Sequence, residues 1–176
     1  MTTDIDLAYI AGIVDGEGYI GIKKSKAYKC QGRVSPGYHA RVQVRMVDEG
    51  AIRFLAHHLG GWYYKEHGNI PTRRLLFCYQ ASDLSASNIL LKILPFLRIK
   101  NQQAKIVLKL RRLQKAGKNH RTKVTGTRTF SGMHGQKIRV RNLAFSDAYI
   151  ARCEILYQKC KYLNRVGPRA EEVRNA

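Results

Sequence analysis

The sequence has few acidic residues, with 12 Asp and Glu against 32 Lys and Arg in 176 residues. It also lacks any apolar run of about 18 residues and any basic-then-apolar start, so nothing in it directs the chain to a membrane or out of the cell. Its four Cys form no CxxC pair, and no His stands at zinc-finger spacing, which argues against a structural zinc site. We therefore expect reduced thiols in an intracellular protein of the cytoplasm, the nucleoid or an organelle. A disulfide is the alternative if the source is a hyperthermophile.

What the sequence has in excess is positive charge, a formal +20 at pH 7, on a chain that is 44% hydrophobic. A basic chain with enough apolar residues to fold favours a polyanionic partner, most often nucleic acid. A ribosomal-type structural protein or a generally basic proteome would give the same composition. The charge is also segregated, because residues 84–146 contain 15 Lys and Arg and no acid, whereas residues 1–22 contain four acids and no Lys or Arg. Such one-sign stretches are typical of surfaces that contact phosphate.

The apolar spacing predicts a mixture of helices and short strands. Helical periodicity and the cap residues Thr3, Asp48, Ser82 and Ser146 predict helices over residues 2–14, 48–60, 82–94, 101–117 and 146–163. Alternation predicts strands over residues 18–31, 38–47, 62–68 and 73–80. The order αββαββα with further helices indicates an α+β fold with an antiparallel sheet. Because no convincing linker occurs, we expect one domain over 1–176, with a core at about 5–115, a weakly structured basic loop at 117–142 and a C-terminal helix at about 146–163.

The stretch IAGIVDGEG, residues 10–18, places Asp15 and Glu17 at the C-terminal end of the first predicted helix. Negative charge there costs about 0.3–1 kcal/mol, because the helix dipole is negative at that end. Three explanations stay open: exposure on a turn, hydrogen bonds to the N–H groups of a neighbouring helix end, or a bound divalent cation, which prefers oxygen ligands. A cation would let phosphate approach an acidic spot on a basic protein. It would also supply the chemistry for cutting a phosphodiester bond, with a nearby Lys to stabilise charge on the phosphate.

These nine residues resemble the motif of the LAGLIDADG homing endonucleases, and LPFLRIKNQQAKIVLKL at residues 94–110 resembles the family segment that carries a basic residue near the active site. The resemblance covers about residues 5–115 and implies the αββαββα core, in which a four-stranded antiparallel sheet forms a saddle on DNA. It implies a site-specific double-strand DNA endonuclease of intron homing that uses Mg²⁺ or Mn²⁺. Because only one motif occurs, it also implies a homodimer on a long pseudo-palindromic site. An intron RNA maturase and a DNA-binding regulator without catalysis are the alternatives.

The resemblance also implies roles for individual residues. Glu17 would bind the metal and act in catalysis, with the carbonyl of Gly16 as a supporting ligand, and Lys100 would be the active-site lysine. Asp15 would be structural and reach backbone N–H groups at the partner's helix. Four residues of the motif helix would lie at the dimer interface: Asp15, Gly12, Ala8 and Ala11.

One position departs from the family pattern. Relatives often carry Gln or another polar residue near the end of the second strand, where it holds a water, and this chain has Met46 there. A thioether cannot position a water in that way. The water-positioning role therefore stays open among Gln43, Arg45 and Gln102.

Side chains that we expect to contact DNA come from the predicted strands and from the basic loop. In the strand over 38–47, polar residues alternate with apolar ones, so one face is basic and amide-rich. Arg and Gln can bind guanine and adenine edges, and a phosphate contact or a solvated side chain is the alternative for each residue. The strand candidates are Lys24, Lys26, Tyr28, His39, Arg41, Gln43, Arg45, Lys65, His67, Arg73 and Arg74. The basic-loop candidates, as flanking phosphate contacts with salt-sensitive affinity, are Lys123, Arg128, Lys137 and Arg139.

Overall fold

A computed structural model describes residues 2–27, 35–66, 75–116, 123–131 and 135–166, with only the backbone described at some positions of the last two ranges. Five helices occur in these ranges: α1 (Asp4–Glu17), α2 (Glu49–Leu59), α3 (Asp83–Ile93), α4 (Asn101–Ala116) and α5 (Asp147–Val166). Six strands occur with them: β1 (Gly18–Ser25), β2 (Gly37–Met46), β3 (Tyr63–Glu66), β4 (Leu76–Ser82), β5 (Lys123–Ser131) and β6 (Lys137–Ala144). The predicted α+β class and the order αββαββα are confirmed.

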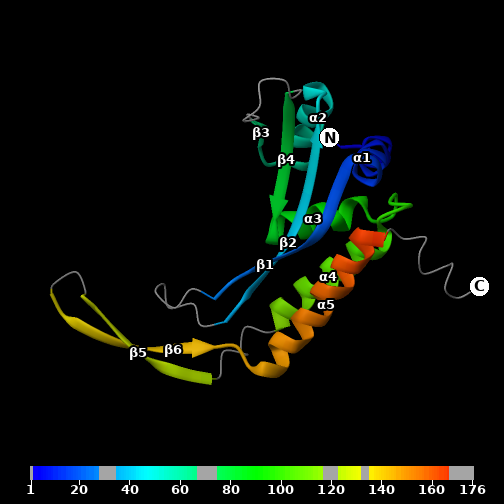
Figure 1. The fold of residues 1–176 in the computed structure, drawn as a ribbon. Coiled ribbons are helices and arrows are strands. Elements are labelled where there is room, and N and C mark those ends of the chain that lie inside the picture. Colours follow the sequence, from blue (N-terminus) through cyan, green and yellow to red (C-terminus); the bar gives the residue numbers. More distant parts are fainter. Residues whose placement is uncertain (1, 28–34, 67–74, 117–122, 132–134, 167–176) are drawn as a thin grey trace, which may run out of the picture.

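The first four strands form one antiparallel sheet in the order β1-β2-β4-β3. Helices pack against one face of this sheet and leave the other face uncovered (Figure 1). The alternation of β2 explains this arrangement, because Ala40, Val42 and Val44 are fully buried beneath the helices. The polar residues between them point to the uncovered face, as the strand period of two requires.

The helix caps largely follow the sequence. Thr3 and Asp6 form a reciprocal capping box at α1, and the Asp48 carboxylate accepts from the N–H of Ala51 at 2.8 Å at α2. The hydroxyl of Ser146 accepts from the N–H of Tyr149 at 3.3 Å at α5. Ser82 takes the N-cap position of α3, but its side chain makes no capping hydrogen bond. The prediction that α3 begins after Ser82 is therefore confirmed, but the predicted side-chain cap is not formed.

The prediction of a weakly structured basic loop over 117–142 is wrong for the described part of that segment. β5 and β6 pair antiparallel as a separate two-stranded ribbon, with Thr129 opposite Arg139 and Ser131 opposite Lys137. The ribbon projects away from the body of the molecule (Figure 1). The basic segment is thus a defined structural arm.

Two expectations from composition can be compared with the structure. No helix in the described ranges is long and apolar enough to cross a membrane. Cys78, Cys153 and Cys160 are buried free thiols, and Cys30 lies outside the described residues, so the prediction of four reduced cysteines is tested for three of them. Burial raises the pKa of the Cys160 thiol to about 11, which makes it a packing residue and not a reactive one.

Candidate active site and nucleic-acid interface

Asp15 caps the turn that leads into α4. Its Oδ2 accepts hydrogen bonds from the N–H groups of Arg98 and Ile99 at 2.7 and 3.0 Å, and its Oδ1 accepts from the N–H of Lys100 at 2.9 Å. Asp15 is only 9% exposed, so these contacts occur in a largely dry environment. The prediction that Asp15 is structural and binds backbone N–H groups is supported, but those groups belong to its own chain. The prediction that they lie at the partner's helix is wrong.

Lys100 returns a contact to the end of α1. Its Nζ donates to the carbonyl oxygens of Val14 and Asp15 at 2.9 and 2.7 Å. Burial lowers the pKa of this ammonium group, and the nearby carboxylates of Asp15 and Glu17 partly offset that effect. The positive charge of Lys100 therefore lies at the negative end of the α1 dipole, which helps to offset the cost of carboxylates there.

The chain turns sharply from α1 into β1 just after Glu17. A Cβ at Gly18 would lie 2.6 Å from the carbonyl oxygen of Val14, so only glycine fits this turn. Glu17 itself is exposed and lines an open cavity of about 390 Å³ on the uncovered face of the sheet, together with Tyr19, Lys23, Arg41, Gln43 and Arg45. The exposed carboxylate thus lies at the start of a cationic hollow.

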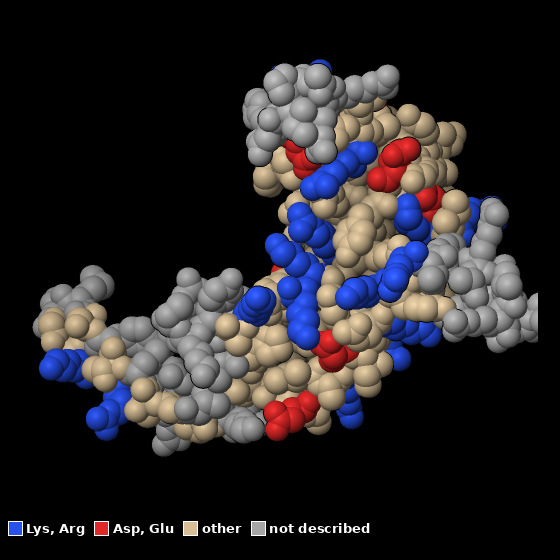
Figure 2. All heavy atoms as spheres, in the orientation of Figure 1, with Lys and Arg blue, Asp and Glu red and all other residues tan. Residues whose placement is uncertain are grey.

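Polar neighbours hold the two arginines of this hollow, Arg41 and Arg45. Arg41 donates to the amide oxygen of Gln80, and Arg45 forms an ion pair with Glu66 at 3.0 Å. The amide orientation of Gln43 that satisfies both groups directs its oxygen to Nε and Nη2 of Arg45 at 2.8 and 3.0 Å. Figure 2 shows Lys and Arg gathered in a band over the sheet, with few acids among them. The face is therefore both preorganised and strongly positive.

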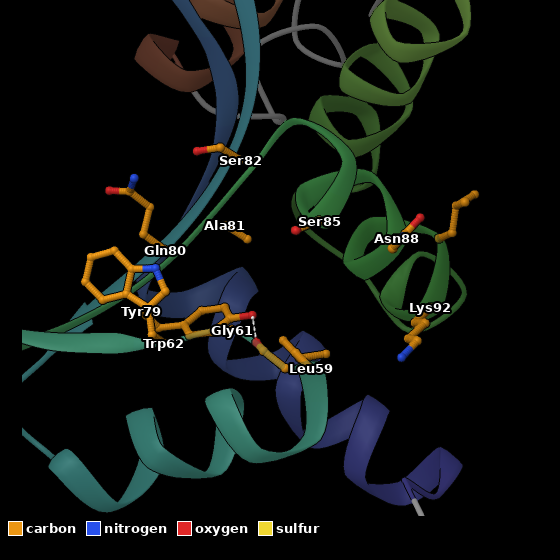
Figure 3. Close-up of a pocket in the computed structure, with 12 residues that line it drawn as sticks. Leu59, Gly61, Trp62, Tyr79, Gln80, Ala81, Ser82, Ser85, Asn88 and Lys92 are labelled. Carbon is orange, nitrogen blue, oxygen red and sulfur yellow. Dashed lines mark hydrogen bonds between the residues drawn. The ribbon is translucent and has the colours of Figure 1, made fainter. Parts of the chain in front are cut away.

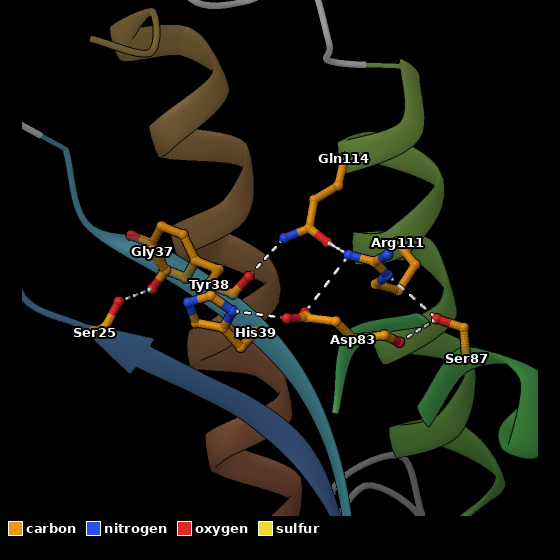
Figure 4. Close-up of polar contacts among 8 residues, drawn as sticks. All are labelled: Ser25, Gly37, Tyr38, His39, Asp83, Ser87, Arg111 and Gln114. Atoms are coloured by element: carbon orange, nitrogen blue, oxygen red, sulfur yellow. Dashed lines mark hydrogen bonds and ion pairs between the residues drawn. The ribbon is translucent and has the colours of Figure 1, made fainter. Parts of the chain in front are cut away.

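His39 belongs to a second polar network farther along the same face (Figure 4). Its Nδ1 lies 3.0 Å from Oδ2 of Asp83, a residue with the unusual backbone angle φ = 48°. Arg111 of α4 lies 3.6 Å from the other carboxylate oxygen of Asp83 and donates to the hydroxyl of Ser87 at 3.3 Å. The network connects the exposed face of β2 to α3 and α4, so the orientation of His39 depends on both helices.

Two predicted DNA contacts in the strands lie on the wrong face of the sheet. Lys24 lies on the same face of β1 as the buried Ile22, and it forms an ion pair with Glu154 of α5 at 2.8 Å. Lys65 shares the face of Tyr63, whose hydroxyl donates to Glu49 of α2 at 3.0 Å. Lys24 and Lys65 both lie on the face covered by the helices, because side chains two residues apart in a strand point to the same face.

Sequence reasoning missed Lys23 and Tyr19, which line the cavity beside Glu17. The signal was present in the sequence, because Ile20 and Ile22 mark the buried side of β1 and so assign Tyr19 and Lys23 to the opposite side. The ring of Tyr19 lies over Gly21, where a Cβ would be 2.2 Å from the Tyr19 hydroxyl oxygen. Gly21 thus allows Tyr19 to lie flat along the strand.

Met46 behaves as its apolar side chain requires. It packs against the core on the helix side, whereas Gln43 and Arg45 line the cavity with Glu17. Gln102 is exposed in the first turn of α4 and is not among the cavity-lining residues. Of the three predicted alternatives for holding a water, Gln43 and Arg45 are therefore the two that lie beside Glu17.

The predicted interface residues of α1 divide into two groups. Ala8 and Gly12 are exposed and lie on a small-residue face of the helix. Ala11 is fully buried in its own chain, so its assignment to a dimer interface is wrong. Ile10, the preceding residue, and Val14, one helical turn later, are also fully buried, so Ala11 lies within the apolar stripe of α1 that faces the core.

Three of the remaining predicted DNA contacts are exposed side chains in the described residues. Lys26, just after β1, and Lys137 and Arg139 in β6 are exposed. Lys123 and Arg128 lie in β5, where only their backbone is described. Four candidates lie outside the described residues: Tyr28, His67, Arg73 and Arg74.

A second cavity, of about 780 Å³, lies elsewhere, where β4 extends past its pairing with β3 (Figure 3). It is lined by Gln80, Ser82 and Trp62 and by side chains of α3, and among the described residues Lys92 is the one charged residue in its lining. Trp62 is 64% exposed, so it is not the packing residue that its size suggests. The described lining residues include no carboxylate, the kind of group that a hydrolytic metal site requires.

Within the described ranges, no three His, Cys, Asp or Glu side chains gather in a way that could hold a metal ion. The oxygen donors at the end of α1 are nevertheless of the right kind for a hard divalent cation, because they comprise the Glu17 carboxylate and a backbone carbonyl. Among the described residues, the chain supplies only one exposed carboxylate at this place. Any metal site here therefore requires oxygen ligands from outside the protomer.

No family model matches the chain. The chain is 30% identical over 107 residues to the DNA endonuclease I-CreI of Chlamydomonas reinhardtii, a match that covers 59% of this chain and 61% of that protein. Among solved structures, it resembles the homing endonuclease I-CvuI in complex with its target, with a TM-score of 0.62, 18% identity, and coverage of 90% of this chain and 82% of that one. It also resembles the archaeal intron-encoded homing endonuclease I-Vdi141I complexed with DNA, with a TM-score of 0.52, 18% identity, and coverage of 65% and 71% of the two chains.

Proposed function

We propose that the chain is a member of the LAGLIDADG homing endonuclease family and a site-specific endonuclease that hydrolyses phosphodiester bonds of double-stranded DNA with Mg²⁺ or Mn²⁺. One observation carries this proposal. The exposed Glu17 carboxylate lies near the Lys100 ammonium group and opens onto the cationic face of the sheet. A binding protein needs the cationic face alone, whereas hydrolysis needs the acid and the lysine as well.

We infer that the active form is a homodimer joined through α1. The exposed side of this helix carries Ile5 and Tyr9, which are 81% and 55% exposed, beside Ala8 and Gly12. Within the described chain, no atom lies within 4 Å of a Cβ built at Gly12 or Gly16. Glycine inside a helix costs about 1 kcal/mol relative to alanine, and close approach of a second helix would explain two of them. A two-fold dimer places two copies of Glu17 near its axis and matches a pseudo-palindromic site.

The residues at the end of α1 fit a divalent cation. The Glu17 carboxylate and the Gly16 carbonyl would hold it, with phosphate oxygens and the second protomer completing the site. When bound, such a cation activates water and stabilises charge on the phosphoryl and leaving oxygens. Glu17 thereby brings negative charge to a face that otherwise repels cations.

Lys100 is positioned to act on the phosphate. Two of the three N–H donors of its ammonium group are directed to the carbonyls of Val14 and Asp15. Within the described residues, the third donor remains for a phosphate oxygen or a water. A fixed ammonium group stabilises developing negative charge without reorganising during the reaction. For holding the attacking water we favour Gln43, whose amide is oriented by Arg45 in the same cavity.

The uncovered face of the sheet would contact the major groove. Lys23, His39, Arg41 and Arg45 project from β1 and β2 on that face, and Gln80 adds an amide from β4. Arg and Gln bind guanine and adenine edges, whereas Lys23 suits a phosphate. Neighbouring groups hold His39, Arg41 and Arg45 in place before DNA binds, which reduces the entropy lost on binding.

The test uses a duplex that spans the insertion site of the gene, made by joining the two DNA segments that flank the inserted element carrying the coding sequence of this chain. The wild-type protein, Glu17→Gln and Asp4→Asn are each incubated with this duplex, with Mg²⁺ and with EDTA, and the products are separated by electrophoresis. Asp4→Asn is the matched control, because it removes an exposed acid from the opposite end of the same helix. We expect scission that needs Mg²⁺ and Glu17 and that survives in the control.

Two other outcomes would replace the proposal. Retention of the duplex without scission at any metal concentration would indicate a DNA-binding regulator. Stronger retention of the intron transcript than of the duplex, again without scission, would indicate a maturase. Scission of equal rate by Glu17→Gln would disprove the assigned role of the carboxylate.

A further inference from the structure

The ribbon of β5 and β6 is an arm of two strands, and the described side chains along one of its faces are exposed. Within the described elements, the extensive contacts of each strand are with the other strand and not with the main sheet or helices. An isolated two-stranded ribbon is only marginally stable in water, because it has no hydrophobic layer to cover. Such an arm is better explained by a partner that binds along it than by packing within the protomer.

One side of the ribbon carries hydroxyl groups and cations in register. Thr127, Thr129 and Ser131 alternate along β5, with Arg139 opposite Thr129 and Lys137 opposite Ser131. All five of these residues are exposed. Residues 84–146, which include both strands, contain no Asp or Glu. Hydroxyl donors and cations without acids are the groups that bind phosphate oxygens, so the surface fits a polyanion.

The base of the ribbon is attached at the end of the sheet that is distant from Glu17. The N–H of Phe145, just after β6, donates to the hydroxyl of Ser35, just before β2, at 3.2 Å. β1 runs from Gly18, next to Glu17, to Ser25 at the same end of the sheet as Gly37. The eight residues of β1 span about 26 Å, at about 3.3 Å per residue. The ribbon therefore begins about one sheet length from the proposed cleavage site, and Figure 1 shows it extending away from α1.

We propose that the ribbon is a second DNA-binding arm, which binds the duplex that flanks the segment covered by the sheet. This inference rests on the proposed function, because it takes double-stranded DNA as the partner. The nine residues of β5 span about 30 Å, which matches about nine base pairs of B-DNA at 3.4 Å each. A two-stranded ribbon fits the major groove, and its Lys, Arg, Thr and Ser contacts go mainly to phosphates on either side.

The arm therefore adds affinity and length of footprint with little sequence information. In a dimer joined through α1, each arm extends away from the two-fold axis. The bound site then has a central segment read by the two sheets and two outer segments held by the ribbons. This organisation predicts that outer base pairs contribute to affinity even when their sequence is changed.

The experiment measures binding to random-sequence duplexes by fluorescence anisotropy, in Ca²⁺ and over a series of salt concentrations. One duplex is long enough for the sheets alone, and another is extended by about one helical turn, about 10 base pairs, at each end. The tested variant is Lys137→Gln/Arg139→Gln. Its matched control is Lys159→Gln/Lys161→Gln, which removes two exposed cations from α5 on the helix side of the protein.

We expect the extension to strengthen wild-type and control binding beyond the statistical gain in sites, and to strengthen the ribbon variant much less. The slope of log K against log salt should fall in magnitude by about 2 per protomer in the ribbon variant, because each phosphate contact contributes about 0.9. A thermal melt equal to that of the wild type shows that the variant is folded. Equal slopes for the two double variants would overturn the proposal.

The two proposals can fail separately. If the wild-type protein binds no duplex at all, the DNA endonuclease assignment and the ribbon proposal both fail. If it binds duplex and the ribbon variant is unaffected, only the ribbon proposal fails. If the ribbon variant loses slope and length dependence but the protein never cuts DNA, the arm stands and the nuclease assignment fails.

Discussion

Replacement of Asp15 by Asn tests whether this buried acid is structural. The change keeps the shape of the side chain but removes its charge and converts one acceptor oxygen into an N–H donor. Because all three carboxylate contacts are with backbone N–H groups, at least one of them then faces a donor. If the amide keeps its oxygen toward Arg98 and Ile99, the contact with the N–H of Lys100 is lost.

The magnitude follows from these contacts. Loss of one hydrogen bond to a charged acceptor costs about 1.5–3 kcal/mol. Loss of the negative charge at the N-terminal end of α4 costs a further ~0.5–1 kcal/mol. We therefore expect Asp15→Asn to lower the free energy of unfolding by about 2–4 kcal/mol, which corresponds to a fall in Tm of about 5–15 °C for a chain of this size.

The assay is urea denaturation followed by circular dichroism, at one protein concentration because the proposed dimer would also stabilise the fold. Asp4→Asn is the control, since it makes the same chemical change at an exposed position of the same helix. It should cost no more than about 1 kcal/mol. A loss of stability for Asp15→Asn no larger than that of the control would refute the capping role derived from the geometry.

Two further predictions concern the dimer and the acid response. Gly12→Leu should leave the protomer folded, because nothing lies near its Cβ within the chain, but light scattering should show a monomer that no longer cuts DNA; a dimer of normal activity would exclude α1 as the interface. Hydrogen bonds from Lys24 and Tyr38 lower the pKa of Glu154 from its ordinary 4.5 to about 2, so its contribution to stability is complete above pH 4.5 and is lost as the pH falls toward 2. That contribution is at most about 3 kcal/mol, and about 1–2 kcal/mol after allowance for partial exposure. The difference in unfolding free energy between wild type and Glu154→Gln should shrink by this amount over that range, and a constant difference would contradict the assignment.

The fold could be predicted from sequence where the local signals agreed. In β2 the alternation of Ala40, Val42 and Val44 with polar residues assigned both faces correctly, because one face is fully buried. In β1 the adjacent Lys23 and Lys24 interrupt the alternation of polar and apolar residues. The prediction therefore placed Lys24 on the uncovered face of the sheet, where Lys23 lies instead. The order of apolar residues, Ile20 and Ile22, is a better guide to strand faces than the position of the charges.

The site could be predicted only in part, because its contacts join distant segments. The motif predicted that Asp15 binds backbone N–H groups, but its partners lie 83 to 85 residues away in the same chain, and no local pattern points to them. The ribbon was missed for a different reason. Its β-branched Val124, Thr127 and Thr129 favour strands, but basic and Gly-rich composition outweighed that preference in the interpretation.

The contacts exchanged between α1 and the segment before α4 affect how the protein could be altered by design. The Asp15 carboxylate accepts hydrogen bonds from the N–H groups before α4, and the Lys100 ammonium group donates to the last carbonyls of α1. The two segments should therefore move together as a rigid body. Any rotation of α1 against a second copy would move the acid and the ammonium group together. The distance between the acidic end of α1 and the Lys100 ammonium group should therefore not depend on changes in the proposed α1–α1 interface. A redesigned interface could then change which protomers pair without altering the geometry of the site within each protomer.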